Sequence, residues 1–265
     1  MNAVKSLRVW LLAVVLGVSG AIETVAGQPP HGNIASQEPT DAQQIYRRCV
    51  AGVVMIICQS EVDDEMSSGS GWVIDKQRRL IITNHHVIAN CPQPVVIFPE
   101  FVNDRVIAEP DHYADKSKLH RGKVILDDKQ RDLAVIQVDV LPAHAIELSI
   151  SEKPVNPGQR VHSIGNPGAA DFGLWILSSG SVRQVATSPA GSNLNPGVRF
   201  VLTQVPINPG DSGGPMLDDD GRVIGVSTAG ATKASMITFA VDVSEVRKIY
   251  GRAIEEQEAL NVSRR

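Results

Sequence analysis

The chain is poor in aromatic residues and in cysteine, and it carries no excess of positive charge. Aromatic residues make up 4% of it, and its three cysteines and seven histidines show no paired zinc-ligand spacing. The formal net charge of −4 at pH 7 argues against nucleic-acid binding as a main activity. Gly165-Asn166-Pro167-Gly168 lacks the Lys-Ser/Thr pair of a P-loop. We therefore predict no metal, no cofactor and no nucleic-acid partner.

The chain also lacks an apolar run that would span a membrane comfortably, which takes about 20 residues. Its N-terminus has Lys5 and Arg8, then the apolar run Val9–Val18, then small residues. This pattern is typical of a secretory signal peptide cleaved after Ala21 or Ala26, with an uncleaved anchor as the alternative. We expect an exported protein, periplasmic or secreted, with no stable membrane span after cleavage.

What the sequence does contain is a series of short Val- and Ile-rich runs, separated by Gly, Pro, Asn and Asp. This spacing favours an all-β barrel or sandwich over alternating α/β units. Two helices are also expected, a short one within Asp41–Val50 and an amphipathic one over Ser244–Leu260 with Ser244 as N-cap. The expected strands include Val53–Ile57, Trp72–Ile74, Val95–Phe98, Val124–Leu126, Leu133–Val138, Val161–Ile164, Val198–Leu202 and Val223–Val226.

The segment Gly210-Asp211-Ser212-Gly213-Gly214-Pro215 places a serine between glycines, where neither helix nor strand is favoured. A sharply turned backbone of this kind can expose the hydroxyl while nearby N–H groups point at the same spot. Acyl transfer needs that combination of nucleophile and oxyanion donors. A surface turn of the same composition is the plainer alternative.

A candidate base and a candidate acid lie upstream, each at the end of an apolar run. His85 and His86 follow Leu80–Ile82, and histidine can accept and return a proton near neutral pH. Adjacent histidines at a strand end point to opposite faces, so a shared metal is not expected. Asp132 leads directly into Leu133–Val138 and can remain ionised if an imidazole N–H bonds it. Its competitors, most of them in polar loop sequence, are Glu109, Asp111, Asp115, Asp127, Asp128 and Asp139.

The order His86, Asp132, Ser212 is that of chymotrypsin-type proteases, and the chain resembles the HtrA/Deg branch of that fold. The resemblance spans about residues 69 to 230, and in the family pattern the catalytic histidine directly precedes valine, which selects His86 over His85. The blocks that carry it are Gly69-Ser70-Gly71-Trp72-Val73-Ile74, Thr83-Asn84-His85-His86-Val87-Ile88, Asp132-Leu133-Ala134-Val135, Ile164-Gly165-Asn166-Pro167-Gly168, Ile207-Asn208-Pro209-Gly210-Asp211-Ser212-Gly213-Gly214-Pro215 and Gly221-Arg222-Val223-Ile224-Gly225-Val226.

The resemblance implies an all-β fold of two six-stranded antiparallel β-barrels with a C-terminal helix. It also implies Ser212 as nucleophile, His86 as base, Asp132 as the orienting acid, and an oxyanion hole from the N–H groups of Gly210 and Ser212. The expected segments are a signal peptide (1–26), a linker (27–43), a trypsin-like serine protease domain (44–260) and a tail (261–265).

The resemblance further implies a primary specificity pocket with Ile207 and Asn208 on one wall and Ser227, Thr228 and Ala229 on the other. Neither wall contains an acidic residue, so a salt bridge to a substrate Lys or Arg is not expected. We predict a broad preference for small to medium aliphatic side chains at the residue before the cleaved bond (P1), because apolar pockets discriminate weakly.

Several features depart from the HtrA pattern. Asp211 stands where relatives typically have Asn, and a buried carboxylate needs a backbone N–H or basic partner. No PDZ domain is expected in this chain, and Gln28–Gln44 has none of the aromatic residues that trimerise many relatives, so the oligomeric state is left open. Cys58 and Cys91 could form a disulfide beside His86, as chymotrypsin-type enzymes often have, or remain buried thiols.

The predicted function is that of an exported serine endopeptidase acting on misfolded or specific envelope proteins, so its partners are protein and peptide substrates. The alternative is a latent or non-catalytic chaperone or binding protein on the same fold.

Overall fold

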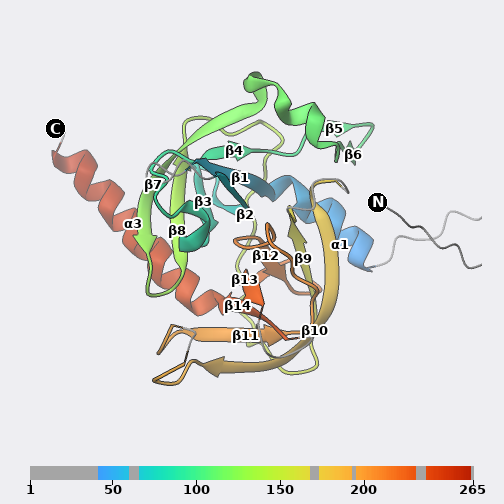
Figure 1. The fold of residues 1–265 in the computed structure, drawn as a ribbon, viewed down its shortest axis with the longest axis vertical. Coiled ribbons are helices and arrows are strands. Elements are labelled where there is room, and N and C mark those ends of the chain that lie inside the picture. Colours follow the sequence, from blue (N-terminus) through green and yellow to red (C-terminus); the bar gives the residue numbers. More distant parts are fainter. Residues whose placement is uncertain (1–40, 60–65, 168–172, 193–194, 231–236, 264–265) are drawn as a thin grey trace, which may run out of the picture. The chain divides into compact units, whose positions relative to one another are not determined.

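Two closed barrels of six antiparallel strands each make up the fold (Figure 1). The computed structural model describes residues 41–59, 66–167, 173–192, 195–230 and 237–263. Both barrels belong to one compact unit, Pro39–Arg265. The predicted chymotrypsin-like all-β class is therefore confirmed. The predicted signal peptide, and the predicted linker up to Thr40, lie outside the described residues.

The first barrel closes in the order β1-β2-β3-β8-β7-β4. Its core forms because each strand turns branched apolar side chains inward at every second position, and Ile56, Ile81 and Ile136 are completely buried there. Its strands are β1 (Val53–Gln59), β2 (Met66–Asp75), β3 (Leu80–Thr83), β4 (Val95–Ile97), β7 (Leu119–Asp128) and β8 (Leu133–Val138).

The second barrel closes in the order β10-β11-β14-β13-β12-β9 and has its own apolar centre, which includes Val201, Met216 and Ile224. All the strands expected from apolar runs are present in one barrel or the other. Its strands are β9 (Arg160–Gly165), β10 (Ile176–Thr187), β11 (Arg199–Thr203), β12 (Pro215–Leu217), β13 (Val223–Gly230) and β14 (Thr238–Asp242).

The expected terminal helices are both present, with shifted ends. Helix α1 (Asp41–Cys49) begins inside the segment predicted as linker, and it is anchored by the fully buried Ile45. Helix α3 (Val243–Ser263) extends through most of the predicted tail and packs on strands of both barrels. The predicted cap was wrong by two residues, since Asp242 Oδ1 accepts the Ser244 N–H at 2.8 Å.

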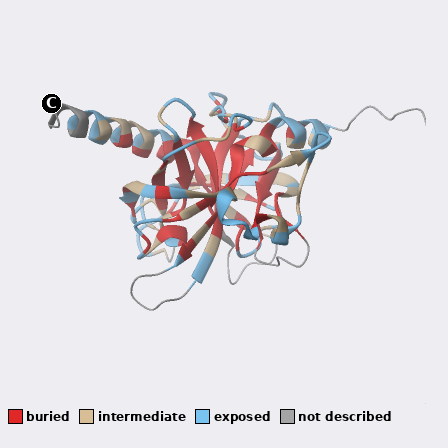
Figure 2. Ribbon diagram, turned by 90° about the horizontal axis from the view of Figure 1, so that it is seen from above, coloured by how far each residue is buried: buried red, intermediate tan, exposed pale blue. Residues whose placement is uncertain are grey.

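The remaining elements are short and lie in connections. Figure 2 shows that the buried residues are concentrated in the central strands, while the exposed ones lie on helices and loops. In the described ranges, no helix has both the length and the apolar character needed to cross a membrane. The short elements are η1 (Val50–Gly52), α2 (His85–Ile88), η2 (Pro110–Ala114), η3 (Lys116–Lys118) and the hairpin β5 (Phe101–Val102) and β6 (Arg105–Val106).

The three cysteines are free, buried thiols. Cys58 and Cys91 belong to the same core cluster of the first barrel, and burial together with the neighbouring Cys91 thiol raises the pKa of Cys58. The structure therefore has the two thiols as neighbours in their reduced form. A bridge between them stays a prediction.

Candidate functional site

His86 and Asp132 form a direct pair at the edge of the first barrel. His86 lies on α2, immediately after β3, and Asp132 ends the turn between β7 and β8. The Asp132 carboxylate oxygens lie 2.9 Å from His86 Nδ1, and Oδ1 also accepts the His86 backbone N–H at 3.0 Å. Asp132 has φ +52°, a left-handed conformation that aspartate tolerates better than most residues. The imidazole is thereby held with its other nitrogen, Nε2, free for chemistry.

Burial alone would raise the pKa of Asp132, because it removes water from the carboxylate. The bonds from His86 and from the Thr228 hydroxyl outweigh burial and hold the pKa below its usual value. Thr228 Oγ1 donates to Asp132 Oδ2 at 2.8 Å. The carboxylate is therefore charged at neutral pH and can stabilise a protonated His86.

The Thr228 contact shows where the β13 residues that were expected to bind substrate direct their hydroxyl groups. Thr228 was expected on the wall of a specificity pocket, but its hydroxyl is directed at Asp132. Ser227, the next residue, is fully buried, and its Oγ lies 3.2 Å from Ser163 Oγ inside the second barrel. Neither hydroxyl is therefore available to a substrate. The side chain of Ala229 lies outside the described residues.

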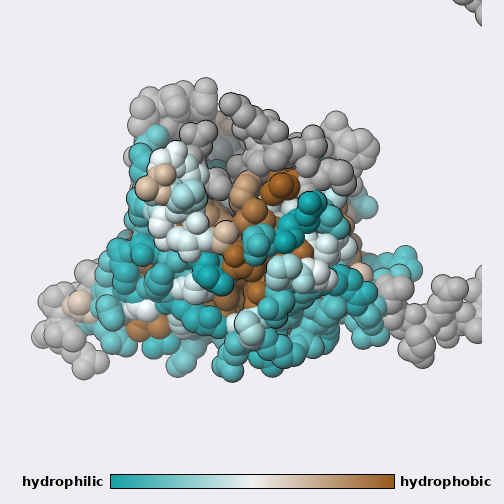
Figure 3. Space-filling model, turned by 90° about the horizontal axis from the view of Figure 1, so that it is seen from below, coloured by the Kyte–Doolittle hydropathy of each residue, from teal (hydrophilic) through white to brown (hydrophobic). Residues whose placement is uncertain are grey.

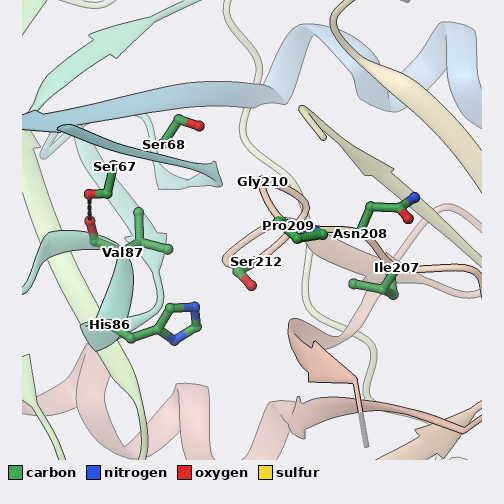
Figure 4. Close-up of a pocket in the computed structure, with 9 residues that line it drawn as sticks. All are labelled: Ser67, Ser68, His86, Val87, Ile207, Asn208, Pro209, Gly210 and Ser212. Atoms are coloured by element: carbon green, nitrogen blue, oxygen red, sulfur yellow. Dashed lines mark hydrogen bonds between the residues drawn. The ribbon is translucent and has the colours of Figure 1, made fainter. Parts of the chain in front are cut away.

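Ser212 lies across a cleft from His86, on the loop before β12 (Figure 4). The loop begins with a tight turn, because the Asp211 N–H donates to the Asn208 carbonyl oxygen at 3.0 Å. Pro209 and Gly210 occupy the centre of that turn, and Gly210 has φ +102°, the combination typical of a type II turn. In the part of the chain that the structure describes, no hydrogen bond joins Ser212 Oγ to His86. Such bonds often tighten only when substrate is bound.

Three backbone N–H groups of the loop donate hydrogen bonds within the protein. The N–H of Asp211 donates to Asn208, that of Gly213 to the Ser227 carbonyl, and that of Gly214 to the Asp211 carbonyl. Among the described residues, the N–H groups of Gly210 and Ser212 have no protein acceptor. These are the two groups expected to form an oxyanion hole.

Asp211 is the unusual residue of this loop. The residue is 5% exposed, and its Oδ2 accepts the Asn208 N–H at 2.8 Å. The partner is thus a backbone N–H, as the sequence led us to expect. Burial raises the pKa of Asp211 to about 6, although the Asn208 bond opposes the shift. A Cβ on Gly165 would lie 2.3 Å from Asp211 Oδ1, so glycine at 165 makes room for the carboxylate.

The cleft itself has a volume of about 310 Å³, the lower end of the range for ligand sites. Figure 4 shows Ile207 and Asn208 on the Ser212 side of the cleft and His86 with Val87 on the opposite side. Of the residues expected to bind substrate, Ile207 and Asn208 line the cleft. The described residues that line the cleft are Ser67, Ser68, His86, Val87, Ile207, Asn208, Pro209, Gly210 and Ser212.

The neighbouring histidine and the competing acids belong elsewhere. His85 Nδ1 pairs with Asp127 Oδ1 and not with Asp132. Asp128 is held by Arg131 and Arg252, which lower its pKa against the effect of burial. Of the acids weighed from the sequence, Asp132 alone bonds His86 in the described part of the chain.

One face of the molecule carries a concentration of hydrophobic surface. Figure 3 shows one face on which hydrophobic residues gather at the centre, between more hydrophilic parts of the surface. Such concentrations often mark interaction sites.

Two residues for which the sequence predicted no role, Ser70 and Asn166, hold the loop of Ser212, the first directly and the second through the first. Ser70, on β2, bonds the carbonyls of both Gly210 and Ser212. Asn166 donates to the Ser70 hydroxyl from the second barrel. Their blocks, Gly-Ser-Gly and Gly-Asn-Pro, were the available signal, but nothing in the sequence shows that they meet.

Comparison with known proteins adds the family. The trypsin-like peptidase domain matches residues 69–226. The "Probable periplasmic serine endoprotease DegP-like" of Pseudomonas fluorescens is 31% identical over 198 residues, which are 71% of this chain and 37% of that protein. "Protease Do-like 5, chloroplastic" of Arabidopsis thaliana is 30% identical over 204 residues, 72% of this chain and 60% of that protein. The chain thus spans less than two thirds of the length of these relatives.

Solved structures show the same fold. "HtrA-type protease AlgW with tripeptide" superimposes with a TM-score of 0.65 at 23% identity, over 83% of this chain and 65% of that one. The "serine endoprotease from Yersinia pestis" superimposes with a TM-score of 0.62 at 23% identity, over 83% and 68% of the two chains.

Proposed function

The chain belongs to the trypsin-like peptidase domain family, and from this we propose that it is an exported serine endopeptidase. The observation that carries the proposal is the grouping of an Asp132-held His86 with Ser212 and two unbonded N–H groups around one cleft. Export is supported by the signal-peptide pattern of residues 1–26 and by relatives named as periplasmic.

In the proposed mechanism, Ser212 Oγ attacks the substrate carbonyl carbon while His86 Nε2 takes the hydroxyl proton. Asp132 stabilises the imidazolium through Nδ1–H, and the N–H groups of Gly210 and Ser212 bind the oxyanion. His86 then returns the proton to the departing amine. A water molecule, deprotonated by the same nitrogen, releases the acyl group from Ser212.

The proposed substrates are misfolded or specific envelope proteins, cleaved with a broad preference for small to medium aliphatic P1 residues. Ile207 and Asn208 support this preference, because neither they nor the other described residues that line the cleft are acidic, so none of them would attract Lys or Arg. Cleavage of a peptide library that clusters after Lys or Arg would contradict this part of the proposal.

The activity is tested by incubating the mature protein with casein, alongside Ser212→Ala and the control Ser151→Ala. Ser151 is buried like Ser212 but bonds Asp218, in the second barrel and away from the cleft. We expect wild type and the Ser151 variant to degrade casein, and the Ser212 variant to lose at least about a thousandfold in rate.

A fluorophosphonate label distinguishes catalysis from the alternative function. We expect one adduct per chain, located at Ser212 by mass spectrometry. No adduct is expected when the protein is denatured before the label is added. A folded wild type that neither cleaves casein nor takes the label, yet suppresses casein aggregation, would favour the non-catalytic chaperone instead.

A further inference from the structure

Ser70 reaches from the first barrel to both residues of the expected oxyanion hole. Its backbone N–H donates to the Ser212 carbonyl oxygen at 2.8 Å, and its hydroxyl oxygen Oγ lies 2.8 Å from the Gly210 carbonyl oxygen. The side chain is fully buried. A Cβ on Gly213 would lie 2.1 Å from the Ser70 carbonyl oxygen, so strand β2 lies too close to the loop for any residue other than glycine at position 213.

The direction of the Ser70 hydroxyl is determined by its neighbours. Asn166 donates to Ser70 Oγ twice, from its backbone N–H at 2.9 Å and from Nδ2 at 3.2 Å. The Asn166 amide is itself oriented, because Oδ1 accepts the Trp175 N–H at 3.0 Å. A hydroxyl has two lone pairs and one proton. With both lone pairs occupied, the proton of Ser70 is directed to the Gly210 carbonyl.

This bond acts next to the peptide group that supplies one oxyanion donor. The Gly210 N–H belongs to the Pro209–Gly210 peptide, whose rotation would turn that N–H out of the cleft. The following peptide, Gly210–Asp211, is held at both ends, its carbonyl by Ser70 and its N–H by Asn208. The preceding peptide, Asn208–Pro209, is held by its carbonyl oxygen, which accepts that same Asp211 N–H. The rotatable peptide is thus flanked by fixed ones.

We propose that the Ser70 hydroxyl is a positioning residue for catalysis, which holds the Gly210 N–H toward the oxyanion from across the two barrels. The inference rests on the proposed protease function and adds to it how the oxyanion hole is maintained. In this chain the hole is held in its binding geometry by contacts already made without substrate. Because Ser70 lies on the first barrel and the loop of Ser212 on the second, the geometry of the oxyanion hole depends on the packing of one barrel against the other.

The test compares Ser70→Ala with wild type and with Ser151→Ala, which removes another buried serine hydroxyl, one that bonds Asp218 and is not among the described residues lining the cleft. With a chromogenic peptide, we expect Ser70→Ala to lower kcat about 10- to 100-fold and to leave KM within about twofold. Affinity for a peptide boronate, which adds to Ser212 as a tetrahedral anion, falls by the same factor as kcat. Binding of an uncleaved peptide to the same variants in the Ser212→Ala background is unchanged.

A second variant, Ser70→Cys, distinguishes a loss of catalysis from a loss of folding. Ser70→Cys fills nearly the same space but offers a weak donor and acceptor, so it keeps the fold and shows the same selective loss in kcat. Melting temperatures of all variants show that each is folded at the assay temperature. A folded Ser70→Ala or Ser70→Cys whose kcat stays within about twofold of Ser151→Ala overturns the inference. A wild type that takes no label at Ser212 overturns the proposed function instead, and the inference with it.

Discussion

Replacing Asp211 by asparagine should stabilise the protein at neutral pH and leave its stability unchanged in acid. The carboxylate of Asp211 is buried and has one backbone N–H as partner, and burial raises its pKa to about 6. Asparagine keeps an oxygen that can accept the Asn208 N–H and carries no charge. The variant therefore removes the cost of ionising the buried carboxyl while it preserves the turn.

The magnitude follows from the shift. The pKa rises from 3.8 to about 6, and each unit corresponds to about 1.4 kcal/mol, which gives about 3 kcal/mol. Folding raises the pKa of Asp211, so the folded protein is favoured while this carboxyl is protonated. That contribution of about 3 kcal/mol to the free energy of unfolding is fully present below pH 3.8 and is lost as the pH rises through about 6. Compared with wild type, the Asp211→Asn variant should be about 3 kcal/mol more stable at pH 8, and the difference should vanish near pH 3.8.

The assay is urea unfolding followed by circular dichroism between pH 4 and pH 8. Both proteins carry Ser212→Ala so that self-digestion does not distort the curves. Since all other titrating groups are shared, the difference between the two free energies of unfolding isolates Asp211. Two pH profiles that run parallel through this range would refute the reasoning, because they would mean that Asp211 ionises in the folded protein as easily as in the unfolded chain.

Three further substitutions test the site. Asp132→Asn should lower kcat about 10⁴-fold with little change in KM, because His86 loses the partner that fixes its tautomer; a peptide assay checks this, and a loss below tenfold would contradict it. Thr228→Val should lower kcat several-fold and shift the loss of activity in acid to higher pH, because Asp132 loses a bond that lowers its pKa; a profile of kcat against pH measures both effects. Gly165→Ala should displace the carboxylate of Asp211 and lower both the melting temperature and kcat, measured by calorimetry and peptide cleavage.

The strands that could be predicted from the sequence are those with concentrated apolar side chains. Leu133–Val138 is a run of apolar residues with one glutamine and coincides with β8. By contrast, β10 (Ile176–Thr187) is polar over much of its length and was not expected, because it is formed by pairing with β9 and β11 and no face of it is fully buried. Its partners are the strands directly before and after it in the chain, but a polar strand without a buried face has no apolar alternation by which local periodicity could reveal it.

The candidate site was predictable to a similar extent. Ser212, His86 and Asp132 were identified because glycine-bounded turns and strand ends expose functional groups, and because their order matches a known family. The orientation of Thr228 was not, since period-two alternation leaves open which neighbour on β13 turns toward the first barrel. That choice depends on how the barrels pack.

The sequence by itself determined the all-β class of fold through its short apolar runs, and its resemblance to a known family predicted the two barrels, the roles of the three principal side chains and the anomaly at Asp211. Tertiary structure alone decided that Ser70 bonds the loop of Ser212, that Asn166 bonds Ser70 and that Thr228 bonds Asp132. These bonds join residues 96 to 140 positions apart, and the packing of the two barrels brings them within hydrogen-bonding distance. Local propensity contains no information about such contacts.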